Sequence, residues 1–265
     1  MAEATPSAAS RGCLYVHGGH ALMVGCAVDN QPHAHYNASV LVATGRPFLF
    51  RHGDAPWQES SGLCVAPCVS QQLRTQDDGV LIMQVDPDGR AYRRFGGRFA
   101  GRPVVPLSDG ERLGILAGVP QGGWNGVEAM RFFVHVVQVL GRLPLPPLVR
   151  DRRVERARRL LAARLEQPPP VQALAASVAL SVSRLQHLFK QELGLSLSHY
   201  LLWRRVRETV QRVQAGISLT EAALHAGFAD SAHFSRTFRR MFGLPPSSLL
   251  KDSSTVQVEI LPDDR

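Results

Sequence analysis

The sequence predicts an α+β protein of two domains, in which an antiparallel β domain precedes an all-α domain. Three observations lead to this prediction. Short β-prone runs separated by Gly, Pro and Asp fill the first half of the 265 residues, a helical segment occurs twice in the second half, and most of the positive charge lies with that repeat. We expect the domains to span residues 1–145 and 148–251, with a stiff proline-rich linker at 143–147.

The first half contains four short runs rich in β-prone residues, at 39–43, 47–51, 62–66 and 80–85. Their spacing predicts an antiparallel sandwich or barrel. The sequence Asp-Pro-Asp-Gly at 86–89 predicts a tight turn that ends the last of these runs.

Residues 126–140 carry apolar side chains at helical spacing, namely Val127, Met130, Phe133, Val134, Val137 and Leu140. This pattern predicts an amphipathic helix whose apolar face closes the barrel or pairs two subunits. We therefore expect a homodimer.

The repeat in the second half consists of residues 171–194 and, shifted by 49 positions, residues 220–243. Each copy predicts a helix, a turn and a second helix. Ser181 and Asp230 occupy the positions where side chains cap the second helices, and Gly194 closes the first of them.

Residues 196–215 between the copies predict one connecting helix. A helix of about 18 to 20 residues is roughly 27 to 30 Å long. Two DNA-reading units that bind one side of a duplex sit roughly 34 Å apart. The connecting helix therefore has the length needed to present both copies to successive grooves.

The second helix of each copy has polar outward positions near its start, as a helix that enters the major groove requires. Gln pairs with adenine and Arg with guanine, so Gln186 and Arg236 are candidate base readers. The predicted DNA-contacting residues are Ser183, Arg184, Gln186, His187 and Lys190 in the first copy, and Ser231, Ala232, His233, Ser235, Arg236, Arg239 and Arg240 in the second.

The distribution of charged residues also indicates DNA as a partner. Residues 148–251 contain 17 Lys and Arg against 7 Asp and Glu, whereas residues 1–147 contain 12 against 11. Cations that displace counterions from phosphates supply much of the affinity for DNA. The sequence therefore predicts double-stranded DNA as the partner of the second domain.

The second half resembles the AraC/XylS family of transcription regulators. The resemblance rests on Leu185-x-x-x-Phe189-Lys190-x-x-x-Gly194, on the segment 226–231, and on the segment 234–246, and it covers about residues 148–251. It implies seven helices, two helix-turn-helix units on one connecting helix, and RNA polymerase as a further partner. Thr209 departs from the small Ala that is usual in the connecting helix.

The first half is similar to the cupin-like sensor domains that often precede such a region, and this resemblance implies a β-barrel with helices. His33 and His35 stand where a cupin has metal-binding histidines, but Gln72 stands where another histidine would bind metal. Two histidines are too few for a catalytic zinc-type site. We expect a pocket without metal or cofactor in which His33, His35 and Gln72 contact a small-molecule effector.

The leading hypothesis is an effector-responsive transcription regulator that is not an enzyme, carries no catalytic residues, has no membrane segment and acts in the cytoplasm. Three alternatives remain. The protein is a cupin-type metalloenzyme fused to a DNA-binding module, or a regulator whose first half only dimerises, or a sensor that responds through Cys64 and Cys68.

Overall fold

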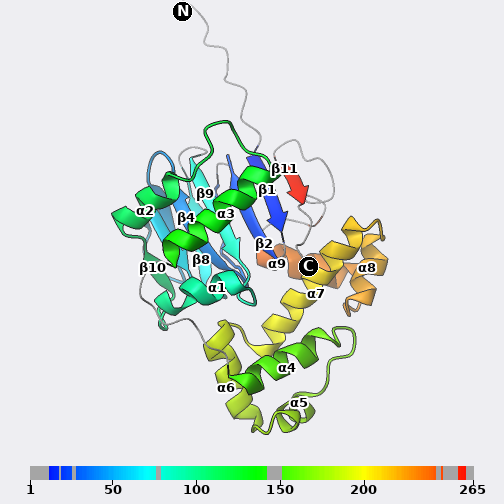
Figure 1. Cartoon of the computed structure of the whole chain (residues 1–265). Helices are drawn as coiled ribbons and strands as arrows, with labels where there is room; N and C mark the ends of the chain where they lie inside the picture. Colours follow the sequence, from blue (N-terminus) through cyan, green and yellow to red (C-terminus); the bar gives the residue numbers. More distant parts are fainter. Residues whose placement is uncertain are drawn as a thin grey trace, which may run out of the picture.

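The computed structural model shows β-sheets with helices against them and a second group of helices that follows in the chain (Figure 1). The structure describes residues 12–17, 19–25, 28–75, 79–141, 151–242, 246 and 256–260. The predicted linker and the boundary between residues 145 and 148 lie outside these ranges.

The strands of the described residues form two sheets. Their bounds are β1 Gly12–His17, β2 His20–Val24, β3 His33–Ala34, β4 Ala38–Ala43, β5 Phe48–His52, β6 Gln58–Ser60, β7 Gly62–Val65, β8 Ser70–Arg74, β9 Val80–Val85, β10 Val104–Pro106 and β11 Val256–Ile260. The large sheet has the order β10-β7-β4-β9-β2-β1-β11, and the small sheet has the order β3-β8-β5-β6. Neighbouring strands are antiparallel except β1 and β11.

The four strands predicted from the sequence are confirmed as β4, β5, β7 and β9, each to within one residue at either end. The prediction missed β8, because Ser70, Gln71 and Gln72 make this strand polar although both glutamines are buried. A polar sequence carries little strand signal by itself.

The predicted barrel is corrected to a sandwich, since the two sheets are hydrogen-bonded separately and do not close on each other. Phe48 and Phe50 of the small sheet are buried with Leu41, Leu63 and Val80 of the large sheet. Alternating side chains of two facing sheets build a core of this kind.

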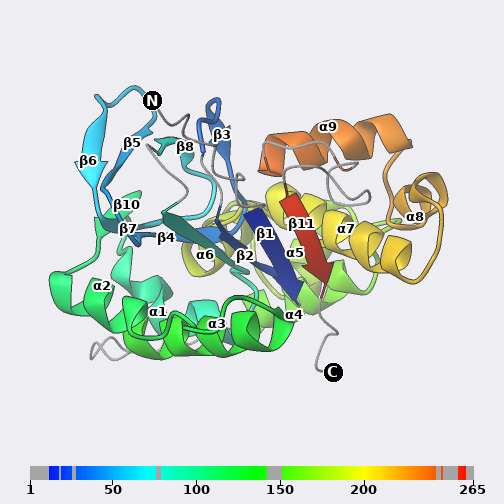
Figure 2. The same ribbon diagram turned by 90° about the horizontal axis from the view of Figure 1, so that it is seen from above.

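The other face of the large sheet is covered by helices α1 Arg90–Phe95, α2 Asp109–Leu116 and α3 Gly126–Leu140, with a short 3-10 turn, η1 Gly96–Arg98 (Figure 2). The bounds of α3 are those predicted, but its buried side coincides with the predicted apolar face only in part, at Val137 and Leu140. Phe132 and Val136 face the sheet, whereas Val127 is 62% exposed and Val134 47% exposed. This helix is apolar on more than one side, so periodicity alone did not select the buried side.

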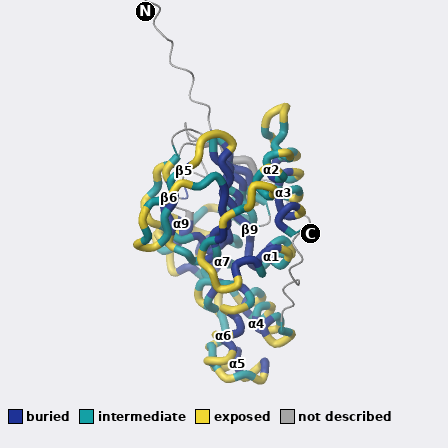
Figure 3. Tube along the Cα trace, turned by 90° about the vertical axis from the view of Figure 1, so that its left-hand side faces the viewer, coloured by how far each residue is buried: buried dark blue, intermediate teal, exposed yellow. Residues whose placement is uncertain are grey.

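The carboxy-terminal domain contains six helices within residues 151–242. They are α4 Arg152–Ala162, α5 Val171–Ser177, α6 Val182–Leu193, α7 Leu197–Gln214, α8 Leu219–His225 and α9 Ser231–Phe242. One apolar cluster joins them, and it includes Leu185, Phe189, Phe234 and Phe238 at the repeated positions. In Figure 3 the strands at the centre are mostly buried, whereas the outer turns around α5 are exposed.

Strand β11 returns the chain to the first domain. It lies parallel to β1 in a register that runs from Gly12 opposite Val256 to Val16 opposite Ile260. The large sheet is therefore completed by residues that follow the helical domain in the sequence.

Candidate nucleic-acid interface

The first helix-turn-helix unit is formed by α5 and α6. The Ser181 hydroxyl accepts a hydrogen bond from the Arg184 N–H at 3.2 Å, which confirms it as the N-cap of α6. Leu185 and Phe189 are fully buried beneath this helix. Gly194 ends it at a φ of 72°, in the left-handed region that favours glycine.

All five residues predicted to contact DNA from the first unit are exposed. They are Ser183, Arg184, Gln186, His187 and Lys190. They share α6 with a fully buried apolar side, so the helix presents its polar side outward as the sequence predicted.

The second unit is formed by α8 and α9, and Gly227 makes the turn between them. Gly227 has a φ of 90°, and a Cβ atom there would lie 2.6 Å from the carbonyl oxygen of Leu165 and 2.9 Å from Nε of Arg205. Asp230 then caps α9 by accepting a hydrogen bond from the His233 N–H at 2.5 Å. Only glycine fits this turn, for reasons of both φ and space.

The predicted contacts of the second unit differ in accessibility. Ala232, Arg236, Arg239 and Arg240 are exposed, whereas Ser231, His233 and Ser235 are half-buried. The His233 ring packs edge-on against Phe228 at 5.2 Å, and the Ser235 hydroxyl donates a hydrogen bond to the carbonyl of Ser231 at 2.8 Å. Arg236 is thus the long exposed polar side chain in the amino-terminal half of α9.

Ion pairing divides the arginines of this domain into two groups. Several arginines of α4 and α7 pair with carboxylates, as Arg212 does with Glu208 at 2.8 Å. Within the part of the chain that the structure describes, no ion pair is formed by Arg184, Lys190, Arg236, Arg239 or Arg240. The cations on the two predicted reading helices are therefore available to phosphates.

Helix α7 separates the two units, with α6 near one end and α8 and α9 near the other (Figure 1). Its 18 residues correspond to a length of about 27 Å. The buried Thr209 donates a hydrogen bond to the carbonyl of Arg205 at 2.8 Å, so its hydroxyl is satisfied within the helix.

One face of α7 docks on the first domain through the turn predicted at 86–89. The buried Asp86 accepts hydrogen bonds from Trp203 Nε1 and from Arg207, both at 3.1 Å. Asp88 accepts from three groups of the second domain, namely Arg158 at 2.9 Å, Tyr200 at 3.2 Å and Arg204 at 3.3 Å.

Burial dominates the protonation of this turn. The pKa of Asp86 is raised to about 6, first because burial penalises its charged form and second because Asp88 is close. Arg207 and Trp203 act in the opposite direction but do not overcome burial. The sequence predicted the turn but not its contacts, although Tyr200, Trp203, Arg204 and Arg207 recur at helical spacing on one face of α7.

The predicted effector residues do not form one group. Nε2 of His33 lies 2.9 Å from Nε2 of His35, and His35 Nδ1 donates to the carbonyl oxygen of Met241 at 2.5 Å. Gln72 instead bonds to Arg51 and to the carbonyl of Asn30. Its neighbour Gln71 is the residue paired with His33 across β3 and β8. Alternation along a strand explains the difference, because adjacent residues face opposite sides.

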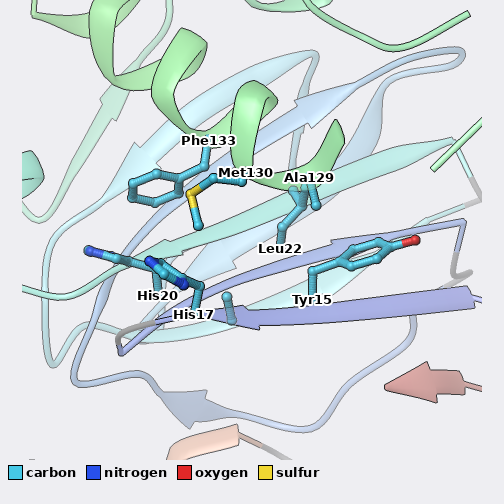
Figure 4. Close-up of a pocket in the computed structure, with 8 residues that line it drawn as sticks. Tyr15, His17, His20, Leu22, Ala129, Met130 and Phe133 are labelled. Atoms are coloured by element: carbon cyan, nitrogen blue, oxygen red, sulfur yellow. The ribbon is translucent and has the colours of Figure 1, made fainter. Parts of the chain in front are cut away.

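A separate small pocket lies between the β1–β2 hairpin and α3 (Figure 4). Met130 and Phe133 of α3 extend toward His17 and His20 of the hairpin. The space in it that a water-sized sphere can occupy is about 20 Å³. This is far below the roughly 300–1,000 Å³ typical of ligand sites, and none of the predicted effector residues lines it.

Among the described residues, no group of three or more His, Cys, Asp or Glu side chains could hold a metal ion. Burial raises the pKa of the Cys64 thiol to about 12 and that of Cys68 to about 11. Such thiols remain protonated near neutral pH, whereas reactive cysteines need the thiolate. These observations do not favour the cysteine-sensor alternative.

Comparison with known proteins identifies the repeat. Residues 174–252 match the family described as a helix-turn-helix domain. The HTH-type transcriptional regulator GbdR of Pseudomonas aeruginosa is 38% identical over 88 residues, which are 33% of this chain and 24% of GbdR. The arabinose operon regulatory protein of Escherichia coli is 33% identical over 143 residues, which are 50% of this chain and 47% of that protein. The chain therefore matches about a quarter to a half of the length of these relatives.

Solved structures of ToxT from Vibrio cholerae have a similar fold. ToxT with a bound unsaturated fatty acid has a TM-score of 0.57 at 9% identity, over 87% of this chain and 94% of ToxT. Another crystal form has a TM-score of 0.53 at 11% identity, over 87% of this chain and 96% of ToxT. The likeness at this identity concerns the two-domain fold. None of the described helices is long and apolar enough to cross a membrane.

Proposed function

We propose that this protein, whose carboxy-terminal domain is an AraC-type double helix-turn-helix, is a sequence-specific transcription regulator that responds to an effector. The observation that carries the proposal is the exposed polar side of α6 and of α9, held at opposite ends of one helix. Relatives that share this domain are transcriptional regulators. The basic charge of residues 148–251 suits the phosphate backbone.

The proposal is tested by selecting duplexes from a random DNA library with the full chain and then substituting single bases in the selected site. We expect two short boxes about one helical turn apart, in which a wrong base costs about 1–3 kcal/mol. Binding that shows no base preference would reduce the function to non-specific DNA binding. Absence of DNA binding at low salt would overturn it.

We propose that the effector contacts His33 and His35, with Gln71 in place of Gln72. Gln84, His35 and Ser39 form a polar cluster at this place. Gln84 Nε2 donates a hydrogen bond to Nε2 of the His35 ring at 3.3 Å, and Ser39 of β4 lies opposite Gln84 of β9. Ser39 Oγ, Gln71 Oε1 and Gln84 Oε1 are buried and have no hydrogen-bond partner among the residues that the structure describes. Each such atom costs about 1–3 kcal/mol, so a ligand that donates hydrogen bonds would be stabilised here.

A thermal-shift screen of small polar compounds tests this effector site. A hit is expected to stabilise the protein and to lose its effect in Gln84→Leu, where the unsatisfied acceptor is removed. Equal stabilisation of the Gln84→Leu variant would place the ligand elsewhere. Ligand binding by a similar fold is supported by ToxT, which has been crystallised with an unsaturated fatty acid bound.

We also propose a homodimer that acts in the cytoplasm on promoters and contacts RNA polymerase. The exposed Val127 and Val134 of α3 support pairing of two chains, since apolar side chains on a helix surface gain by burial. Contact with RNA polymerase rests on the family resemblance. Light scattering on the full chain and on the Val127→Lys/Val134→Lys variant tests the dimer. The lysines are expected to dissociate it, because they place like charges on both sides of the interface.

A further inference from the structure

The first domain touches the carboxyl ends of both predicted reading helices. At the end of α6, a Cβ atom on Gly194 would lie 3.1 Å from Pro67 Cγ and 3.3 Å from the Tyr92 hydroxyl. Near the end of α9, His35 donates its hydrogen bond to the carbonyl of Met241. Figure 2 shows β3, which precedes His35, beside α9.

Between these two contacts, the first domain also holds α7. Asp86 and Asp88 receive hydrogen bonds from four α7 side chains that recur over two helical turns, from Tyr200 to Arg207. Asp88 also binds Arg158 of α4, a helix that contacts α5 and α6 of the first unit. The carboxylates of Asp86 and Asp88 are 2% and 6% exposed, so solvent screens these contacts only weakly.

We propose that the first domain is a brace that fixes the distance and rotation between the two reading helices, and that Asp86, Asp88 and His35 are positioning residues that set the spacing of the two DNA boxes. This proposal rests on the proposed function. It assigns to the first domain a role in choosing the site, beyond the response to an effector.

The physical argument is geometric. One extra base pair between the boxes moves the second box by about 3.4 Å and rotates it by about 35° around the duplex. The first domain holds the two helix-turn-helix units at three places, namely at Gly194, along α7 and at Met241. The units therefore cannot follow this change without breaking a buried contact. Units held by α7 alone would adapt by bending where the helix meets each unit.

The test uses the full chain and the two-box duplex that it selects, together with versions in which one or two base pairs are inserted between the boxes. For the unaltered protein we expect each insertion to weaken binding about tenfold or more, the cost of losing base contacts in one box. For Asp86→Asn/Asp88→Asn we expect a loss of less than about threefold, with unchanged affinity for a duplex that carries only one box. Glu208→Gln is the matched control, because it removes an ion pair of α7 that does not involve the first domain.

If the double variant does not fold, His35→Leu and the single Asp88→Asn variant carry the same test. Equal spacing penalties in the variants and the unaltered protein would overturn the brace. Absence of sequence-dependent binding to the two-box duplex by the unaltered protein would instead overturn the proposed function, so the two failures are distinguishable. A variant that is less stable but keeps the full spacing penalty would show that Asp86 and Asp88 have only a structural role.

Discussion

The indole of Trp203 donates a hydrogen bond to the carboxylate of Asp86 at 3.1 Å, across the junction of the two domains. Trp203 is 4% exposed and Asp86 1% exposed. A buried carboxylate is costly unless hydrogen bonds and an opposite charge compensate it, and here Trp203 and Arg207 offset part of that cost. The junction is therefore a specific polar contact and not a loose tether.

We predict that Asp86→Ala lowers the free energy of unfolding by about 1–3 kcal/mol, because Trp203 Nε1 loses its carboxylate partner in a buried place. Urea denaturation of the full chain measures this loss. Asp54→Ala is the control, since Asp54 is exposed. Equal stability of Asp86→Ala and Asp54→Ala would contradict the contact.

Asp86 also predicts a dependence of stability on pH. The folded protein keeps the Asp86 proton up to about pH 6, whereas the unfolded chain loses it near pH 3.8, so the folded state binds more protons between these values. Stability due to this group therefore falls as the pH rises from about 4 to about 6, and levels off above. One pKa unit is worth about 1.4 kcal/mol, which gives a change on the order of 2–3 kcal/mol.

The measurement compares the free energy of unfolding of the unaltered protein and of Asp86→Asn across this pH range. Relative to the variant, the unaltered protein is expected to become less stable as the pH rises. Parallel pH profiles of the two proteins would show that the pKa of Asp86 is not raised.

We predict that Gly227→Val destabilises the second unit by more than about 2 kcal/mol. Gly227 has a φ of 90°, and a Cβ atom at this position would lie 2.6 Å from the carbonyl oxygen of Leu165. Gly122→Val is the control, because no atom of the described part of the chain lies within 4 Å of a Cβ at Gly122. Circular dichroism on heating measures both, and a Gly227→Val protein as stable as the control would refute the turn.

Arg236 is predicted to read a base, because it is exposed in the amino-terminal half of α9. Arg236→Ala is expected to cost about 1–3 kcal/mol on the selected site and to relax the preference at one position. Binding to a panel of substituted sites measures this. A uniform loss on every sequence would indicate a phosphate contact instead.

Arg239 and Arg240 are predicted to bind phosphates, since both are exposed further along α9. Removing either one is expected to weaken binding about equally on all sequences and to reduce the slope of log affinity against log salt by about 1. Titrations at several salt concentrations measure the slope. A slope that stays the same would argue against phosphate contact.

The helices of the second domain could be predicted well because their signals are local. Ser181 and Asp230 cap helices by bonding to nearby backbone N–H groups, and Gly194 and Gly227 adopt positive φ where each chain segment turns. Such signals lie within a few residues of the structure that they specify.

The contacts between the domains could not be predicted, because they join residues far apart in the sequence. The sequence Asp-Pro-Asp-Gly at 86–89 predicts a turn, but no sequence pattern pairs Asp86 or Asp88 with Trp203 or Arg158. Likewise only part of the predicted apolar face of α3 is buried, since several sides of this helix are apolar and the sheet selects one. The grouping of His33 with Gln71 depends on register, and a sequence alone does not state the register of β3 and β8.

Strand β11 has a consequence for how the protein is made. Because synthesis runs from the amino to the carboxyl end, β1 leaves the ribosome about 240 residues before its parallel partner does. Until then one edge of the nascent sheet exposes N–H and C=O groups on which a neighbouring nascent chain can assemble. A tag fused directly after Ile260 would thus disturb the pairing of β11 with β1, the first strand to be synthesised.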